Sequence, residues 1–303
     1  MQEIAIRHGS RMANRMLQYL TAIGLSGPET RISGYDIAEW GMAGPKPGGG
    51  HRAWPKVDVQ RVDAQWLRGL LADGRLTRLK LTEAVCDVDL LPDRTTANAA
   101  FYAGDQDIHP LTDRDLLIHV RLEDIMVPGR HTGYGPLPLN WYQQIIDETG
   151  LHPVFIGQLG DDPYSDAIRA RFPGATLLEG GTVLHDFQTL RAAPNVALGV
   201  STFSWLAAWL GQADRVFYPL LGILNPSQAP GINLTPASDP RYEFWHFPPR
   251  QWMADGPAIE AVTQGPHGAT RLEESQVATL LTNARAAADP AISEWRARVE
   301  AAR

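Results

Sequence analysis

The sequence predicts an α/β fold, and three observations point to it. A short apolar strand over 3–7 is followed by a polar turn and then by a helix over 12–23, whose apolar residues recur at helical spacing. After residue 110, predicted strands and helices alternate at regular intervals. Such alternation is typical of a parallel sheet with helices on its faces, and a length of 303 residues favours two domains over one.

The second half of the chain carries most of this alternation. The predicted strands cover 116–120, 153–156, 175–178, 196–200 and 215–218, the last of these being the final strand. The predicted helices between them cover 140–149, 165–172, 186–192 and 203–210, and Gly150 suits the end of the first. Ligands of parallel sheets bind at the carboxyl ends of the strands, so residues that follow these strands are the candidates for function.

The domain boundary is expected near residue 110, in the polar and turn-prone stretch GDQDIHPLTDRD. We expect an N-terminal α/β domain over 1–110, a C-terminal domain over 111–270, and a tail over 271–303. The tail has two helical stretches with Asp289 and Pro290 between them. We expect it to pack back on the first domain; a contact between two copies is the alternative. The Gly- and Pro-rich stretch 42–56 is predicted to be a loop, and it lacks the Gly-Lys-Ser/Thr of a phosphate-binding loop.

Composition excludes several classes of protein. A formal net charge of -7 and a pI near 5.7 argue against a nucleic-acid binder with a broad basic surface. The single cysteine, Cys86, allows neither an internal disulfide nor a cysteine-type zinc site, and a reducing cytoplasm is the simplest compartment. The N-terminus lacks the apolar core of a signal peptide, and no apolar run approaches the ~20 residues of a membrane span. No His-Glu-x-x-His motif or aspartate cluster indicates a metal.

The stretch LIHVRLEDIM, over 117–126, changes from apolar to charged where its strand ends. His119 and Arg121 alternate with Val120 and therefore share one side of the strand. An arginine at this position presents a fork of donors that suits a phosphate. Alternatively, Arg121 pairs with Glu123 or Asp124 and fixes the loop, and His119 is a hydrogen-bonded core histidine.

The stretch GVSTFSWLAAWL, over 199–210, is a second candidate. Ser201 and Thr202 stand where a strand gives way to a helix. They either cap the helix, or form with its N-terminus an anion site. A serine-hydrolase elbow is excluded because Phe203 stands where that motif needs glycine. Asp186 lies at the predicted start of another helix, where it either caps that helix or contacts a nucleoside.

Four segments in order resemble the α-1,2-fucosyltransferases (glycosyltransferase family 11). MANRMLQY over 12–19 resembles their L-G-N-Q-M-F-Q-Y, and HVRLED over 119–124 resembles their H-V-R-R-G-D. DFQTL over 186–190 fits their D-x-x-L-L-type segment, and STFSWLAAWL over 201–210 resembles their S-S-F-S-W-W-A-A-W-L. The resemblance covers roughly residues 4–225. Ala13, Arg15, Glu123 and Leu206 depart from the family's Gly, Gln, Gly and Trp.

The resemblance implies a GT-B architecture, in which two Rossmann-like domains face each other across a cleft. The first domain would be the acceptor side, and the second would bind GDP-fucose. Carried over residue by residue, the donor would be bound by the following side chains: Asn14, His119, Arg121, Asp186, Ser201, Thr202 and Phe203. Arg121 would contact the diphosphate, and Asp124 would be the base or would orient Arg121.

The implied activity is inverting, metal-independent transfer of fucose from GDP-fucose to a hydroxyl of an oligosaccharide acceptor. It needs no cofactor, and surface polysaccharide synthesis is the expected setting. Arg121 with backbone N–H groups would stabilise the negative charge of the leaving diphosphate. His8 and His131 are further candidates for the base. The alternatives are a glycosyltransferase that uses another nucleotide sugar, and a non-catalytic relative that binds a nucleotide or glycan.

Overall fold

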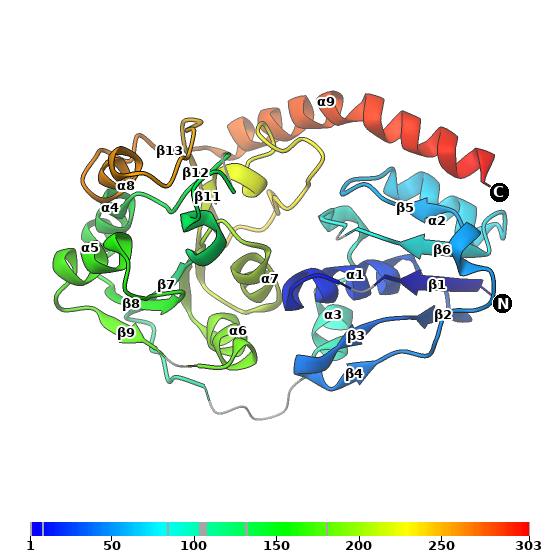
Figure 1. Ribbon diagram of the computed structural model, residues 1–303, viewed down its shortest axis with the longest axis horizontal. Coiled ribbons are helices and arrows are strands. Elements are labelled where there is room, and N and C mark those ends of the chain that lie inside the picture. Colours follow the sequence, from blue (N-terminus) through cyan, green and yellow to red (C-terminus); the bar gives the residue numbers. More distant parts are fainter. Residues whose placement is uncertain are drawn as a thin grey trace. The chain divides into compact units, whose positions relative to one another are not determined.

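A computed structural model of the protein describes residues 2–7, 9–83, 85–102, 108–130, 133–179 and 181–302. The chain divides into two compact units. The first unit comprises Met1–Gly104, Ala229–Thr235 and Leu280–Arg303. The second unit comprises Asp105–Gln228 and Pro236–Thr279. Figure 1 shows the helices and strands of both. Each unit holds its own parallel sheet, and the predicted α/β class with two parallel-sheet units is confirmed.

The first unit has a parallel sheet of four strands in the order β2-β1-β6-β5. Its strands are β1 (Gln2–Ile6), β2 (Thr30–Ser33), β5 (Lys56–Val57) and β6 (Arg78–Leu81). A separate antiparallel hairpin is formed by β3 (Asp36–Ile37) and β4 (Met42–Ala43). The helices that belong wholly to this unit are α1 (Met12–Leu25), α2 (Ala64–Ala72) and α3 (Arg94–Ala100).

The two faces of this sheet differ because side chains alternate along each strand. One face carries Ile4, Ile6, Leu79 and Leu81, which pack in one apolar core with residues of α1, α2 and the C-terminal helix. The opposite face carries the buried carboxylate of Glu3. Glu3 Oε1 accepts hydrogen bonds from the Ser33 hydroxyl and the Gly48 N–H, at 2.6 and 3.1 Å. The Gly-rich loop is thereby attached to the polar face.

The second unit has a seven-stranded sheet in the order β13-β12-β11-β10-β7-β8-β9. All neighbours are parallel except β12 and β13. The strands are β7 (Asp115–Val120), β8 (His152–Gly157), β9 (Thr176–Leu178), β10 (Asn195–Ala197), β11 (Arg215–Leu220), β12 (Tyr242–His246) and β13 (Thr270–Arg271). The helices are α4 (Leu139–Thr149), α5 (Pro163–Arg171), α6 (Val183–Ala192), α7 (Thr202–Leu210) and α8 (Gly256–Thr263).

Helices cover both faces of this second sheet. In Figure 1, α4, α5 and α8 lie on one face, and α6 and α7 lie on the other. Leu116, Ile118 and Val120 of β7 point into the core that contains Trp141 and Tyr142 of α4. The intervening His119 therefore faces the layer of α6 and α7. Helix α7 is buried along nearly its whole length, as expected of a helix that is apolar on every side.

Two predictions about the end of the chain are wrong. The strand near 215–218 is not the last, because β12 adds a parallel strand beside β11, and β13 adds an antiparallel one. The tail is not interrupted at Asp289–Pro290: α9 (Glu274–Ala301) is one helix with Pro290 inside it. A stripe of buried side chains continues across the proline and stabilises the helix on both sides of it: Ala284, Ala288, Ile292, Trp295 and Val299.

Two distant segments complete the first unit. In α9, the Trp295 indole donates to the backbone oxygen of Lys56 at 2.9 Å, and Arg298 pairs with Asp58 at 2.9 Å. The segment Ala229–Thr235 comes from the loop between β11 and β12. Its Asn233 side chain donates to Asp87 and Asp89, at 2.9 and 3.1 Å. The sequence reasoning did not assign this segment to the first unit.

Candidate functional site

The strand order of the second unit indicates where a ligand would be expected. From β9 to β12 the order is 9-8-7-10-11-12, which is third, second, first, fourth, fifth and sixth along this unit. This is the doubly wound order of nucleotide-binding α/β domains, and its direction reverses between β7 and β10. The helix after β7 and the helix after β10 lie on opposite faces of the sheet (Figure 1), so the loops that lead to them diverge there.

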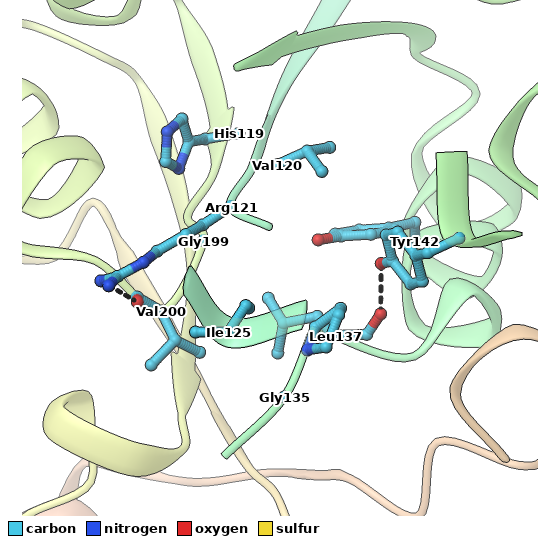
Figure 2. A pocket seen from close by; sticks show the side chains of 11 residues that line it. His119, Val120, Arg121, Ile125, Gly135, Leu137, Tyr142, Gly199 and Val200 are labelled. Carbon is cyan, nitrogen blue, oxygen red and sulfur yellow. Dashed lines mark hydrogen bonds between the residues drawn. The ribbon is translucent and has the colours of Figure 1, made fainter. Parts of the chain in front are cut away.

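A pocket lies at this reversal, beside the carboxyl ends of β7 and β10. Three short segments supply most of its lining: 119–121 at the end of β7, 199–200 after β10, and 135–137 before α4. Figure 2 shows Arg121 reaching from the end of β7 toward the carbonyl group of Val200. Tyr142 of α4 lines the opposite side. The pocket is therefore lined both by residues of LIHVRLEDIM, over 119–121, and by the first two residues of GVSTFSWLAAWL, Gly199 and Val200.

Arg121 is held by a neighbouring carboxylate. Its Nη2 donates to both oxygens of Asp124, at 3.1 Å each, and Nη1 lies 3.5 Å from the oxygen of Val200. The two side chains are 18% and 14% exposed, so the pair is mostly shielded from water. Of the two carboxylates considered from the sequence, Asp124 is the partner seen here. The buried Nε of Arg121 has no hydrogen-bond partner in the part of the chain that the structure describes.

His119 is a neutral histidine in a tight site. It is 5% exposed, and burial, followed by the charge of Arg121, lowers the pKa of His119 to about 3. Among the described residues its buried Nδ1 has no hydrogen-bond partner. The ring packs against that of Phe203, with centroids 5.5 Å apart. His119 therefore does not fully match the alternative of a hydrogen-bonded core histidine, because its Nδ1 has no hydrogen bond among the described residues.

Two glycines make room for this histidine. A Cβ on Gly199 would lie 2.6 Å from His119 Nδ1, which is closer than atoms pack. A Cβ on Gly157 would lie 2.3 Å from the oxygen of Val120, and Gly157 has a φ of +118°. Both glycines follow or end strands adjacent to β7. The sequence reasoning missed them, although glycine directly after an apolar strand is a sign of close backbone approach.

The N-terminus of α7 follows Val200 of this lining, but Ser201, Thr202 and Phe203 are not themselves lining residues. Ser201 is its N-cap, and the hydroxyl accepts a hydrogen bond from the N–H of Phe203 at 3.2 Å. The Ser204 hydroxyl donates to the oxygen of Gly199 at 3.2 Å. Capping by Ser201 is therefore present, and Thr202 is the first residue of the helix. The partial positive charge of this helix end adds to the charge of Arg121.

The backbone after Arg121 is strained at Glu123. This residue has a φ of +34°, in the region that favours glycine. Glu123 occupies the position where the fucosyltransferase motif has glycine. The turn that brings Asp124 back to Arg121 thus has a conformation that a glycine would adopt without a Cβ penalty.

Asp186 and Asn14 lie outside this pocket lining. Asp186 does not cap α6: the cap is Thr182, whose hydroxyl accepts from the N–H of His185. Asp186 lies one turn later, 3.6 Å from His185 Nδ1. Partial burial raises the pKa of Asp186 despite the opposing effect of His185. Asn14 is half-buried on α1 of the first unit.

The departure at Arg15 has a structural role in the first unit. Its Nη2 donates to both carboxylate oxygens of Glu39, at 2.6 and 2.8 Å, and Nη1 donates to the backbone oxygen of Asp36 at 3.1 Å. Arg15 therefore ties α1 to the hairpin region.

Metal-binding groups and membrane-spanning helices are two further features of a chain that bear on its function. The described residues hold no group of three or more His, Cys, Asp or Glu side chains able to bind a metal ion. Within the same residues, no helix has the length and apolar character needed to cross a membrane. His8 and His131, the further candidates for a base, lie outside the described residues.

Comparison with known proteins gives a structural likeness only. No family model matches the chain, and no curated protein matches it. E. coli heptosyltransferase WaaC with ADP is 13% identical, with a TM-score of 0.39 over 93% of this chain and 97% of that chain. E. coli ADP-heptose LPS heptosyltransferase II is 13% identical, with a TM-score of 0.37 over 93% of this chain and 99% of that chain. At such values the likeness does not extend to donor or acceptor, and neither structure is a fucosyltransferase.

Proposed function

We propose that the protein is a glycosyltransferase that takes a sugar from a nucleoside diphosphate sugar. The observation that carries this proposal is the pocket at the strand reversal of the second unit. His119 and Arg121 line this pocket, and His119 has an unpartnered ring nitrogen. Helix α7 begins two residues after Val200, which is also part of the lining. A doubly wound sheet binds nucleotides at this position, and the two positive groups suit a diphosphate.

The proposed reaction is an in-line displacement at the anomeric carbon of the donor sugar. An acceptor hydroxyl oxygen forms the new bond to C1, the bond from C1 to the diphosphate oxygen breaks, and the hydroxyl proton passes to a general base. The nucleoside diphosphate leaves with the bonding electrons. Arg121 and the α7 N-terminus would stabilise the charge that develops on it. In this account the first unit binds the acceptor.

Asp124 fits a positioning role in this scheme better than the role of base. Both carboxylate oxygens of Asp124 accept hydrogen bonds from Arg121 Nη2. Neither oxygen is therefore reserved for the hydroxyl of an acceptor sugar. A guanidinium fixed in this way needs little reorganisation when charge develops on the leaving group. His119 would remain neutral beside the donor, because its pKa is lowered to about 3. Ser201, Thr202 and Phe203 would shape the phosphate end of the site.

There are two candidates for the donor sugar nucleotide. GDP-fucose is the donor implied by the ordered motifs, and the strained Glu123 at the family's glycine position agrees with it. A different nucleotide sugar is the second candidate. It is favoured by Arg15, which is bound to Glu39 where the fucosyltransferases have a glutamine. Asn14 and Asp186 stay proposed donor ligands under the first alternative only.

Calorimetric titration of GDP, ADP and UDP in the presence of EDTA tests the proposal. We expect one nucleotide to bind the wild type, and Arg121→Ala to weaken it by about tenfold to a hundredfold, as the loss of a charge-assisted hydrogen bond predicts. Arg215→Ala is the matched control, since Arg215 lies at the amino end of β11, away from the carboxyl ends of the strands, and pairs with Glu243. Equal affinities in wild type and Arg121→Ala would contradict the site. Loss of binding caused by EDTA alone would contradict metal independence.

A further inference from the structure

The polar face of the first unit's sheet carries a group of basic side chains. Lys56 of β5 and Lys80 of β6 are direct neighbours in register. Arg7 follows β1, and its N–H donates to the oxygen of Leu81 at the end of β6. Arg52 comes from the short helix in the Gly-rich loop. We call these four side chains the cationic face: Arg7, Arg52, Lys56 and Lys80.

The same face contains an internal contrast. Glu3 of β1 and Arg78 of β6 are register partners, two residues nearer the amino ends of these strands than Ala5 and Lys80. Glu3 also forms an ion pair with Arg31 at 3.2 Å. The row across the sheet that contains Lys56 and Lys80 continues with Ala5 of β1 and Ser33 of β2. Neither of these two residues carries a charge. Across the residues that the structure describes, no member of the cationic face forms an ion pair. The positive charge at the carboxyl side of this sheet is therefore uncompensated.

The electrostatics of Lys80 agree with this geometry. The pKa of the Lys80 amine is lowered, first by partial burial and then by the charges of Lys56, Arg7 and Arg52. Like charges on adjacent strands start from backbones only about 4.8 Å apart and repel each other. A chain with a net charge of -7 has many acidic residues that could have neutralised this cluster. An anion that binds between these side chains would remove the repulsion.

We propose that the cationic face binds a phosphate monoester on the acceptor saccharide. Four positive charges match a group that carries nearly two negative ones better than they match a single carboxylate, and lysine binds phosphate well as a point charge. The face lies toward the carboxyl end of a parallel sheet, where ligands bind. This inference rests on the proposed transferase function and names the class of its acceptor.

A membrane surface is the competing source of phosphate, and the exposed residues argue against it. Binding in a bilayer interface requires apolar side chains beside the basic ones. Among the described residues, the large exposed apolar side chains are Tyr102, Val127, Val183 and Met253. None belongs to β1, β5, β6 or the loop that carries Arg52. A saccharide phosphate therefore fits the face better than a lipid headgroup.

The test is an NMR titration of the whole chain with glucose 6-phosphate, glucuronate and glucose. We expect glucose 6-phosphate to shift the amide signals of Arg7, Lys56 and Lys80, with weaker effects from glucuronate and none from glucose. Lys56→Gln/Lys80→Gln should weaken the binding of glucose 6-phosphate about tenfold or more. The control Arg75→Gln/Arg114→Gln removes the same charge from two exposed positions elsewhere and should bind as the wild type does.

Nucleotide titrations of the same proteins separate the two proposals. Unchanged nucleotide affinity in Lys56→Gln/Lys80→Gln, together with lost sugar-phosphate binding, supports the cationic face as an acceptor site. Nucleotide binding without any glucose 6-phosphate binding overturns the inference and leaves the transferase function intact. Glucose 6-phosphate binding without nucleotide binding overturns the transferase function and, with it, the assignment to an acceptor.

Vesicles provide the remaining arm of the test. Phosphatidylcholine vesicles with and without phosphatidylglycerol are sedimented with the wild type and with Lys56→Gln/Lys80→Gln. No sedimentation of the protein supports a saccharide ligand. Sedimentation that requires phosphatidylglycerol and is lost in the variant, without glucose 6-phosphate binding, would overturn the inference in favour of a membrane surface. Lys56→Gln alone, a change at an exposed position, repeats both measurements if the double variant does not fold.

Discussion

The two sheets of this protein place basic side chains near their carboxyl ends in different ways. In the second unit, Arg121 is fixed by both oxygens of Asp124 and is mostly shielded from water. In the first unit, Lys56 and Lys80 stand side by side, and among the described residues neither has an ion-pair partner. A paired and mostly shielded cation is prepared for one geometry, whereas cations without an ion-pair partner suit a ligand whose position is less narrowly set. This contrast would suit the proposed roles, a precisely held donor in the second unit and a variable acceptor in the first.

The largest predicted effect is a pH dependence of the free energy of unfolding, caused by His119 in the second unit. His119 titrates at about 3 in the folded protein and near 6.5 when unfolded, so below pH 6.5 the unfolded chain binds more protons. The free energy of unfolding should fall as the pH falls, by up to about 1.4 kcal/mol per pH unit from this group, or roughly 2–3 kcal/mol between pH 6.5 and 4.5. Urea unfolding at several pH values measures it.

His119→Gln isolates this effect, because it removes the titrating ring. The variant should lose less stability than the wild type between pH 6.5 and 4.5. His152→Gln, at an exposed position, is the control and should follow the wild type. Parallel pH profiles for wild type and His119→Gln would show that His119 is not buried in its neutral form.

The next prediction concerns a substitution that should disrupt the pocket of the second unit without replacing a charged residue. In Gly199→Ala the new Cβ would lie 2.6 Å from His119 Nδ1 and 2.8 Å from the His119 oxygen. Overpacking of this kind costs about 1–3 kcal/mol, and the displaced strand ends should also weaken nucleotide binding. Thermal unfolding and calorimetry measure the two consequences.

Gly174→Ala is the matched control for that substitution. Gly174 belongs to the same unit, and a Cβ there would meet nothing within 4 Å. The control should keep the wild-type nucleotide affinity. Equal affinity in Gly199→Ala would contradict the placement of the ligand at the reversal between β7 and β10.

A smaller effect is expected at the strained turn after Arg121. Glu123→Gly should stabilise the protein by up to about 1 kcal/mol, because the left-handed penalty of about 1–2 kcal/mol exceeds the entropic cost of glycine. Glu179→Gly, at an exposed position after β9, should instead be neutral or slightly destabilising. Chemical denaturation distinguishes them, and a Glu123→Gly protein less stable than the wild type would refute the strain.

The smallest effect tests the first unit. Lys56→Gln/Lys80→Gln should leave the stability unchanged or raise it by a few tenths of a kcal/mol, since repulsion is relieved and no ion pair among the described residues is lost. Arg298→Gln, which removes the ion pair with Asp58, should not raise it. A clear loss of stability in the lysine variant would mean that these side chains are partnered.

Much of the second unit could be predicted from the sequence, because its strands are short apolar runs separated by good helix signals. The predicted strands over 116–120 and 153–156 lie within β7 and β8. Arg121 could be placed at the pocket because it directly follows the apolar strand β7. Ser201 could be recognised as a helix cap because it comes just before the apolar helix α7. By contrast, β12 (YEFWH) was missed because its aromatic and charged residues do not form an apolar run.

Other features depend on contacts that no local pattern records. The cap of α6 is Thr182 rather than Asp186, a choice that depends on where the helix begins. The docking of Asn233 on Asp87 joins residues 146 positions apart. The uncompensated charge of the cationic face depends on the register of β5 with β6, which sets Lys56 beside Lys80. These are tertiary relations, and a single sequence does not carry them.

The most direct test of the central claim is to map nucleotide binding on the backbone amides by NMR. With the nucleotide that calorimetry selects, we predict the largest shifts at residues 119–121 and 199–204, at the carboxyl ends of β7 and β10. Residues at the amino ends, such as Arg215, should not shift. Largest shifts at those amino ends, or confined to the first unit, would contradict the claim that the second unit binds the donor at its strand reversal.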